Sequence, residues 1–180
     1  TVKRVDIARI GFGQSVAVTP LQLLTAASAA VNGGNLMRPY VVKEVRDAQG
    51  NVLEETQPLV VSQPIRPETS ATMRSLLENV VTNGGGRNAY AEGYRIGGKT
   101  GTAQIYVDGV ISSDMHIGSF IGFAPMDDPQ IAVLFIVDEA DVPVDYGSTT
   151  AAPYAKEVLT QSLKYLGFAP EIEQEEEVAT

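Results

Sequence analysis

Hydrophobic positions recur along this chain with two different periods, and the period changes near the middle of the sequence. Spacings typical of amphipathic helices cover residues 19–31, 73–81 and 155–166. Patterns typical of strands cover residues 94–107, 118–124 and 130–137. The short turn at residues 125–129 favours antiparallel pairing of the strands on either side of it. Together these patterns predict an α+β fold, in which an antiparallel sheet is flanked by helices.

The first helix carries its own start and stop signals. Thr19-Pro20-Leu21-Gln22 forms a capping box with proline at the first helical position, and Asn32-Gly33-Gly34 ends the helix. Beyond it, residues 40–45 and 51–55 predict a small exposed β-hairpin without chemistry of its own. The second helix ends at the three glycines 84–86, which indicate either a plain helix terminus or a mobile loop near a site.

The later strands carry two further predictions. Residues 131–137 are apolar at every position, which predicts a central strand covered by helices on both faces. Residues 112–117 predict a polar loop that carries the single histidine, His116, interpreted here as a surface residue and not as a catalytic base. One histidine without other ligands nearby predicts no metal site. Ser148-Thr149-Thr150 precede the last helix, and we interpret them as its cap and not as nucleophiles.

Composition and charge narrow the class of protein. A chain of 180 residues with 44% hydrophobic residues suits one domain with a core, and it contains no cysteine for disulfides or thiolate metal sites. The net charge of −9 includes five glutamates in the last ten residues, so the remainder has 17 acidic and 13 basic residues. No basic stripe offsets this charge, which argues against nucleic acid as a partner. We assign residues 1–169 to the domain and 170–180 to a solvated acidic linker.

The candidate chemistry lies in Gly97-Gly98-Lys99-Thr100-Gly101-Thr102-Ala103-Gln104. These eight residues place one cation, two hydroxyl groups and three glycines inside a predicted strand. Small residues leave the backbone of a strand bare, so a ligand can approach its N–H groups closely. The lysine beside those N–H groups makes the stretch a candidate site for a carboxylate or a phosphate.

A nucleotide-binding alternative follows from the same residues. Gly93-x-x-x-x-Gly98-Lys99-Thr100 satisfies the Walker A pattern, and residues 134–139 form an apolar strand that ends in two acidic residues. A Walker A lysine opens a helix whose N-terminal amides hold phosphates. Lys99 is instead followed by the alternating residues 101–107 and an Asp108-Gly109 turn, which is the pattern of a strand and hairpin. The context therefore favours the strand.

Lys99-Thr100-Gly101 also matches the Lys-Thr-Gly strand motif of penicillin-binding proteins and serine β-lactamases. Other segments accompany it in order: Gly13-Gln14, Thr19-Pro20-Leu21-Gln22, Asn32-Gly33-Gly34, Ser119-Phe120-Ile121-Gly122-Phe123-Ala124-Pro125 and Ala151-Ala152-Pro153. The series resembles the C-terminal half of the transpeptidase domain of class B penicillin-binding proteins, over residues 11–170. The resemblance implies part of the serine β-lactamase-like fold.

The resemblance also implies a reaction and a set of roles. It implies acyl transfer through a serine ester on peptidoglycan stem peptides ending in D-Ala-D-Ala, β-lactam binding, no cofactor, and a place on the extracytoplasmic face of the membrane. Lys99 would set the positive potential, and the hydroxyls of Thr100 and Thr102 would bind the substrate carboxylate. The Thr102 N–H would join the oxyanion hole, and Gly101 would let substrate lie against the strand edge. The flanking substrate-binding residues would be Gly98, Ala103 and Gln104.

The sequence departs from the family pattern where the nucleophile should be. No serine is followed by lysine three residues on or by asparagine two residues on. We therefore expect residues 1–169 to be the C-terminal half of a larger transpeptidase, inactive alone, whose partner is an N-terminal half carrying the nucleophile and the membrane anchor. Two alternatives stay open: the P-loop protein, and a non-catalytic module that keeps the binding strand.

Overall fold

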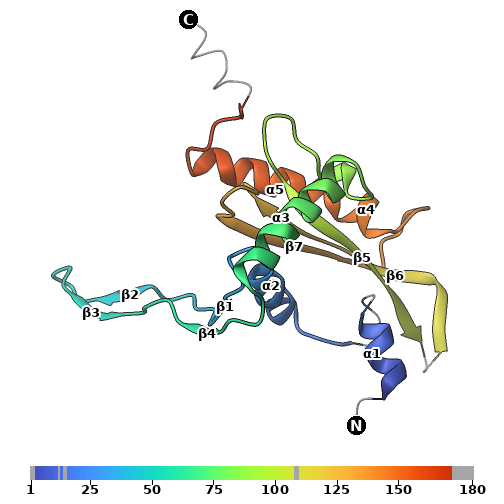
Figure 1. Cartoon of the computed structure of the whole chain (residues 1–180), viewed down its shortest axis with the longest axis horizontal. Helices are drawn as coiled ribbons and strands as arrows, with labels where there is room; N and C mark the ends of the chain where they lie inside the picture. Colours follow the sequence, from blue (N-terminus) through green and yellow to red (C-terminus); the bar gives the residue numbers. More distant parts are fainter. Residues whose placement is uncertain (1–2, 12, 14–15, 108–109, 172–180) are drawn as a thin grey trace, which may run out of the picture.

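A computed structural model describes residues 3–11, 13, 16–107 and 110–171 of the chain. Its centre is an antiparallel sheet with strand order β5-β6-β7 (Figure 1). The bounds of these strands are Gly97–Val107 for β5, Val110–Ala124 for β6 and Ile131–Asp138 for β7. The main helices are α2 (Pro20–Ala29), α3 (Pro67–Thr82) and α5 (Ala152–Tyr165). The shorter helices are α1 (Arg4–Ile10), η1 (Arg87–Ala89) and α4 (Gly147–Thr150). The predicted α+β fold with an antiparallel sheet is confirmed.

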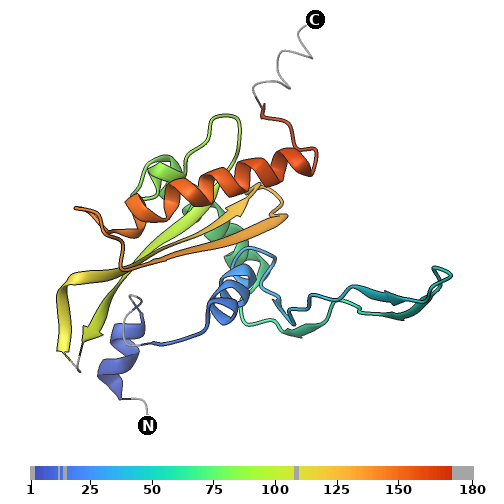
Figure 2. The ribbon, with the colours of Figure 1, turned by 180° about the vertical axis from the view of Figure 1, so that it is seen from behind.

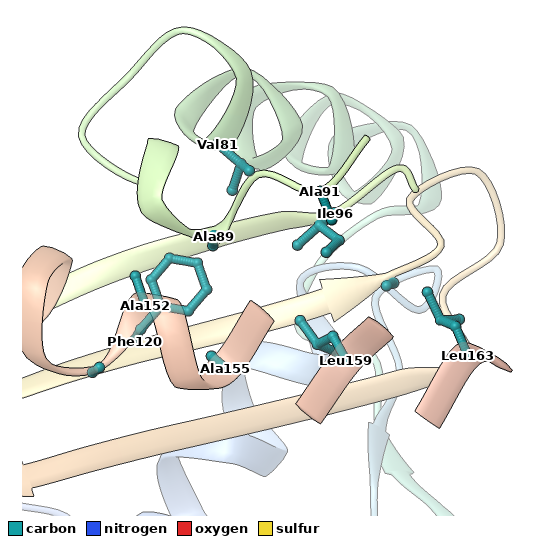
Figure 3. Close-up of a cluster of buried hydrophobic side chains, with 11 residues drawn as sticks. Val81, Ala89, Ala91, Ile96, Phe120, Ala152, Ala155, Leu159 and Leu163 are labelled. Carbon is teal, nitrogen blue, oxygen red and sulfur yellow. The ribbon is translucent and has the colours of Figure 1, made fainter. Parts of the chain in front are cut away.

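Two hydrophobic cores lie on opposite faces of the sheet. On one face, Phe120 of β6 and Leu159 and Leu163 of α5 belong to one cluster, and all three side chains are fully buried (Figure 3). On the other face, Phe123 of β6 packs with Val31 and with Leu77 of α3. Residues three apart on a strand point to opposite faces, so β6 contributes one phenylalanine to each core. The sheet thus has α5 on one face and α2 on the other, while α3 lies along β5 and contributes Val81 to one core and Leu77 to the other (Figures 1 and 3).

The polar loop predicted for residues 112–117 is wrong. These residues belong to β6, in which His116 is paired with Gln104 and Ile117 with Ala103, while residues 112–115 lie where the register between β5 and β6 shifts. The ladder is made by backbone hydrogen bonds, which polar residues form as well as apolar ones, so polarity did not indicate a loop here. The predicted Asp108-Gly109 turn lies outside the described residues, between the paired Val107 and Val110.

The central position predicted for residues 131–137 is also wrong, because β7 is an edge strand of the described sheet and β6 is the central one. The expected cover on both faces is present. Val133 and Phe135 pack against the core of α5, whereas Ala132 packs with Ala27 of α2 in the other core. A run of apolar residues indicates that both faces of a strand are covered. It does not indicate whether other strands pair with both of its edges.

The helix signals are confirmed at α2. Thr19 Oγ1 accepts the Gln22 N–H at 3.2 Å, and Gln22 Oε1 accepts the Thr19 N–H at 2.9 Å, which completes the capping box. Gly33 and Gly34 both adopt positive φ after the helix. After α3, the N–H groups of Gly84 and Gly86 donate to Val80 O at 3.1 and 2.9 Å, so the three glycines close a helix terminus.

An exposed arm leaves the body between α2 and α3 (Figures 1 and 2). It contains two antiparallel pairs: β1 (Leu36–Met37) with β4 (Val60–Ser62), and β2 (Glu44–Arg46) with β3 (Val52–Glu55). The outer pair confirms the predicted hairpin. In its turn, Asp47 accepts hydrogen bonds from the side chain and backbone of Asn51, which lower the pKa of the Asp47 carboxyl.

No described helix is both long enough and apolar enough to span a membrane. Among the described residues, no group of three or more histidine or acidic side chains is arranged to hold a metal ion.

Ser70 provides a test of how α3 is attached to the end of α2. Its side chain is fully buried, and its Oγ accepts the Gly33 N–H at 3.0 Å. Because Ser70→Ala leaves this N–H unpaired, we expect the free energy of unfolding to fall by about 1–2 kcal/mol in urea denaturation. Ser75→Ala, at an exposed position of the same helix, should change it by less than about 0.5 kcal/mol. Equal effects of the two substitutions would contradict this assignment.

Candidate functional site

The candidate residues lie on β5, which is an edge strand of the described sheet. Gly97 and Gly98 are buried, whereas Lys99, Thr100, Gly101, Thr102, Ala103 and Gln104 are half-buried or exposed. A side chain at Gly98 would overlap the Phe120 ring and the Ile121 carbonyl oxygen. Gly98 therefore makes room for the core, and the accessible part of the stretch begins at Lys99.

The register between β5 and β6 assigns each candidate side chain to a face of the sheet. Thr100 is paired with Phe120, which lies on the α5 face, and Thr102 therefore lies on that face too. Lys99 is paired with Ile121, which packs on the α2 face. The exposed Lys99 Nζ donates to Thr100 O at 2.9 Å. The cation and the hydroxyl groups thus lie on opposite sides of one edge strand, with backbone groups between them.

The start of β5 is attached to α3 by an ion pair. The Arg95 guanidinium donates two hydrogen bonds of 2.8 Å to the two carboxylate oxygens of Glu78. The Glu78 carboxylate raises the pKa of Arg95 above its ordinary value, so this guanidinium stays charged. A bidentate pair fixes orientation as well as distance, so it holds the entry to β5 in place.

The start of α4 lies directly against β5. The Gly147 N–H donates to Thr102 Oγ1 at 3.3 Å. A side chain at Gly147 would overlap the carbonyl oxygens of both Ser119 and Gly101. Only a glycine lets the backbone of α4 come this close to the paired strands. No local pattern pairs Gly147 with Thr102, since the two residues are 45 residues apart.

The surface position predicted for His116 is wrong. Its side chain is only 17% exposed, and its Nδ1 lies 2.8 Å from Asp145 Oδ2. The ring of Tyr146 lies edge-on to the imidazole, with the ring centroids 6.3 Å apart. Asp145 and Tyr146, in the segment before α4, cover the histidine, and the sequence did not show this segment near it.

The capping role predicted for Ser148-Thr149-Thr150 is also wrong. These residues belong to α4 itself, and the hydroxyls of Thr149 and Thr150 both donate back to Tyr146 O, at 2.9 and 3.0 Å. The following helix, α5, begins at Ala152 without a side-chain cap. A threonine hydroxyl inside a helix donates to the carbonyl oxygen of an earlier residue, whereas a capping hydroxyl accepts from a free backbone N–H.

The nucleotide-binding alternative is not supported. Lys99 is the third residue of a strand and does not open a helix, so no helical amides are available beside it for phosphates. In that alternative the acidic residues after the apolar strand would hold Mg²⁺, but Asp138 lies at the end of β7, and β6 separates that strand from β5.

Comparison with known proteins identifies the family. A family model described as the penicillin-binding protein transpeptidase domain matches residues 1–160. The chain belongs to this family. Stage V sporulation protein D of Bacillus subtilis is 47% identical over 167 residues, which cover 92% of this chain and 26% of that protein. The probable peptidoglycan D,D-transpeptidase PenA of Neisseria flavescens is 31% identical, over 93% of this chain and 40% of PenA.

Solved structures agree with the assignment to a penicillin-binding D,D-transpeptidase domain. The apo transpeptidase domain of Burkholderia pseudomallei penicillin-binding protein 3 superposes with a TM-score of 0.79 at 31% identity, over 94% of this chain and 49% of that one. Penicillin-binding protein 3 of Mycobacterium tuberculosis in complex with ampicillin gives a TM-score of 0.80 at 25% identity, over 92% and 40%. This chain thus spans less than half the length of each of these relatives.

Two glycines of the transpeptidase motif should respond differently to the same substitution. Gly98→Ala forces a methyl group into the Phe120 ring and the backbone, so we expect a loss of about 1–3 kcal/mol in the free energy of unfolding. Gly101→Ala meets only the Ser119 hydroxyl, which can rotate, so we expect less than about 1 kcal/mol. Urea denaturation of both variants measures the difference, and the opposite order would refute the packing role of Gly98.

Proposed function

We propose that this chain is the ligand-holding C-terminal part of a serine D,D-transpeptidase that crosslinks peptidoglycan stem peptides and is acylated by β-lactams. The observation that carries the proposal is the accessible edge of β5, where Lys99, Thr100 and Thr102 surround one stretch of backbone. Family membership supports this proposal, because the relatives include named peptidoglycan D,D-transpeptidases and an ampicillin complex.

The substrate would bind along β5 as an additional strand. An extended peptide pairs with an exposed sheet edge through main-chain hydrogen bonds, and β5 is the edge strand that carries the motif. The terminal D-Ala carboxylate would lie between the positive charge of Lys99 and the hydroxyl groups of Thr100 and Thr102. Gly101 would allow the close approach, with Gly98, Ala103 and Gln104 as its neighbours along the strand.

The reaction would proceed in two balanced steps. A serine oxygen attacks the carbonyl carbon of the penultimate D-Ala, the C–N bond breaks, and the terminal D-Ala leaves with a proton on its nitrogen. An amine of a second stem peptide then attacks the ester carbonyl, and the serine oxygen leaves and regains its proton. The Thr102 N–H, with the N–H of the nucleophile, would stabilise the oxyanion in both steps.

The serine would come from a segment outside this chain. No serine here has the Ser-x-x-Lys spacing, and the chain spans 26% of stage V sporulation protein D. The outer edge of β7 has no strand partner among the described residues, and Ile136 on this strand is 41% exposed. That edge is suited to pairing with a further strand. The same outside segment would anchor the protein at the extracytoplasmic face of the bacterial membrane.

A fluorescent penicillin tests the proposal. The chain alone should take up no label that survives denaturation. A chimera in which this chain replaces the matching segment of stage V sporulation protein D should be labelled, because the nucleophile is then present. A folded chimera that is never labelled would refute the proposal and favour a non-catalytic module.

Substitutions in the chimera test the individual roles. Lys99→Ala should lower the labelling rate about 100-fold or more, because it removes the positive charge beside the ligand. Thr102→Val removes one hydroxyl at nearly constant volume and should lower the rate about tenfold. Lys164→Ala, which removes a charge from an exposed position on α5, is the matched control and should leave the rate unchanged. An unchanged rate in the Lys99 variant would contradict its role.

A further inference from the structure

The Thr102 hydroxyl has a hydrogen-bond partner before any ligand is present. The Gly147 N–H donates to Thr102 Oγ1 at 3.3 Å. A threonine hydroxyl can accept hydrogen bonds and donate one, so accepting from Gly147 leaves its own proton for another group. A carboxylate or an oxyanion accepts hydrogen bonds only. The contact with Gly147 therefore prepares Thr102 to act as a donor toward an anionic ligand.

Gly147 is kept against Thr102 by contacts on both sides of it in the sequence. On the N-terminal side, Asp145 is bonded to His116 of β6, with 2.8 Å between Oδ2 and Nδ1. On the C-terminal side, the Ser148 carbonyl oxygen accepts a hydrogen bond of 2.7 Å from the Asn88 side chain. The His116–Asp145 contact ties the start of α4 to the strand that is paired with β5.

This contact is suited to holding a position. The side chains of His116 and Asp145 are only 17% and 15% exposed, so the bond is less weakened by water than a pair on the surface. The edge of the Tyr146 ring adds a second contact to the imidazole. Nδ1 carries a proton in one neutral tautomer and in the imidazolium, and both forms can donate to the carboxylate. The contact therefore does not depend on one charge state of the histidine.

We propose that His116 and Asp145 are positioning residues for Thr102. By holding the segment before α4 against β6, they keep the Gly147 N–H on Thr102 Oγ1 and so direct the threonine proton toward the ligand. The consequence for acylation rests on the proposed function above. The effect on the Gly147 hydrogen bond can be measured without any reaction.

Three variants separate this role from a general effect on folding. His116→Leu fills similar space and removes the donor. His116→Asn keeps a donor nitrogen on Cγ, at the position of Nδ1, and should preserve the contact with Asp145. Val110→Ala, at a 69% exposed position of the same strand, is the control for a substitution in β6 that touches neither residue.

Amide hydrogen exchange in the full chain, followed by NMR, is the first measurement. In His116→Leu the Gly147 amide should exchange about 5–10-fold faster, the change expected when one hydrogen bond is lost. In His116→Asn and Val110→Ala its rate should stay within about twofold of the unsubstituted chain. The amides of α5 should be unchanged in all three variants. Unchanged exchange of Gly147 in His116→Leu would overturn the proposal, whatever the protein's activity.

A double-mutant cycle in the chimera is the second measurement. His116→Leu should lower the penicillin acylation rate about tenfold, and His116→Asn should restore most of it. In the Thr102→Val background, His116→Leu should have no further effect, because the hydroxyl through which it acts is gone. If His116→Leu lowers the acylation rate by the same factor with and without Thr102→Val, the two residues act independently and the positioning role is overturned. If the unsubstituted chimera is not acylated, the proposed function fails, and the exchange experiment still decides the role of His116.

Discussion

The register between β5 and β6 is the constraint on which the rest of this structure depends. It pairs Thr100 with Phe120 and Lys99 with Ile121, and so assigns hydroxyl groups and cation to opposite faces of the sheet. Because side chains alternate along a strand, a slip of one residue would exchange the two faces. Phe120 and Phe123 resist such a slip, since each is buried in a different core on its own side of the sheet.

Close packing at glycines connects this register to the candidate site. Gly122 leaves space for Leu159 of α5, and Gly118 leaves space for Thr150 of α4. The helices on this face can therefore lie near the sheet backbone, and the Gly147 N–H comes within 3.3 Å of Thr102 Oγ1. Some glycines in and beside the motif thus admit the core, and in the proposed function Gly101 would leave the strand bare for a ligand.

In the proposed function, this arrangement would be one half of a binding surface. β5 supplies a cation, two hydroxyl groups and an edge without a further strand partner among the described residues, which suit an extended peptide that ends in a carboxylate. Nothing in the sequence supplies the nucleophile in the Ser-x-x-Lys pattern. The unpaired edge of β7 lies at the far side of the same sheet. A segment that adds strands there and a serine beside β5 would complete both the sheet and the site.

Local features were predictable from the sequence because the interactions that produce them join residues close together in the chain. The Thr19–Gln22 capping box starts α2, the spacing of Ala155, Leu159 and Leu163 marks the buried face of α5, and the residues after Lys99 exclude a helix there. The motif order around Lys99 also identified the family.

Contacts between distant residues were decided only by the tertiary structure. The edge position of β7 depends on which strands pair with it, and its own apolar run could not show that. His116 meets Asp145 across 29 residues, and Gly147 meets Thr102 across 45. No local pattern marks such pairs, because they form only when the β5–β6 ladder and the start of α4 are packed together.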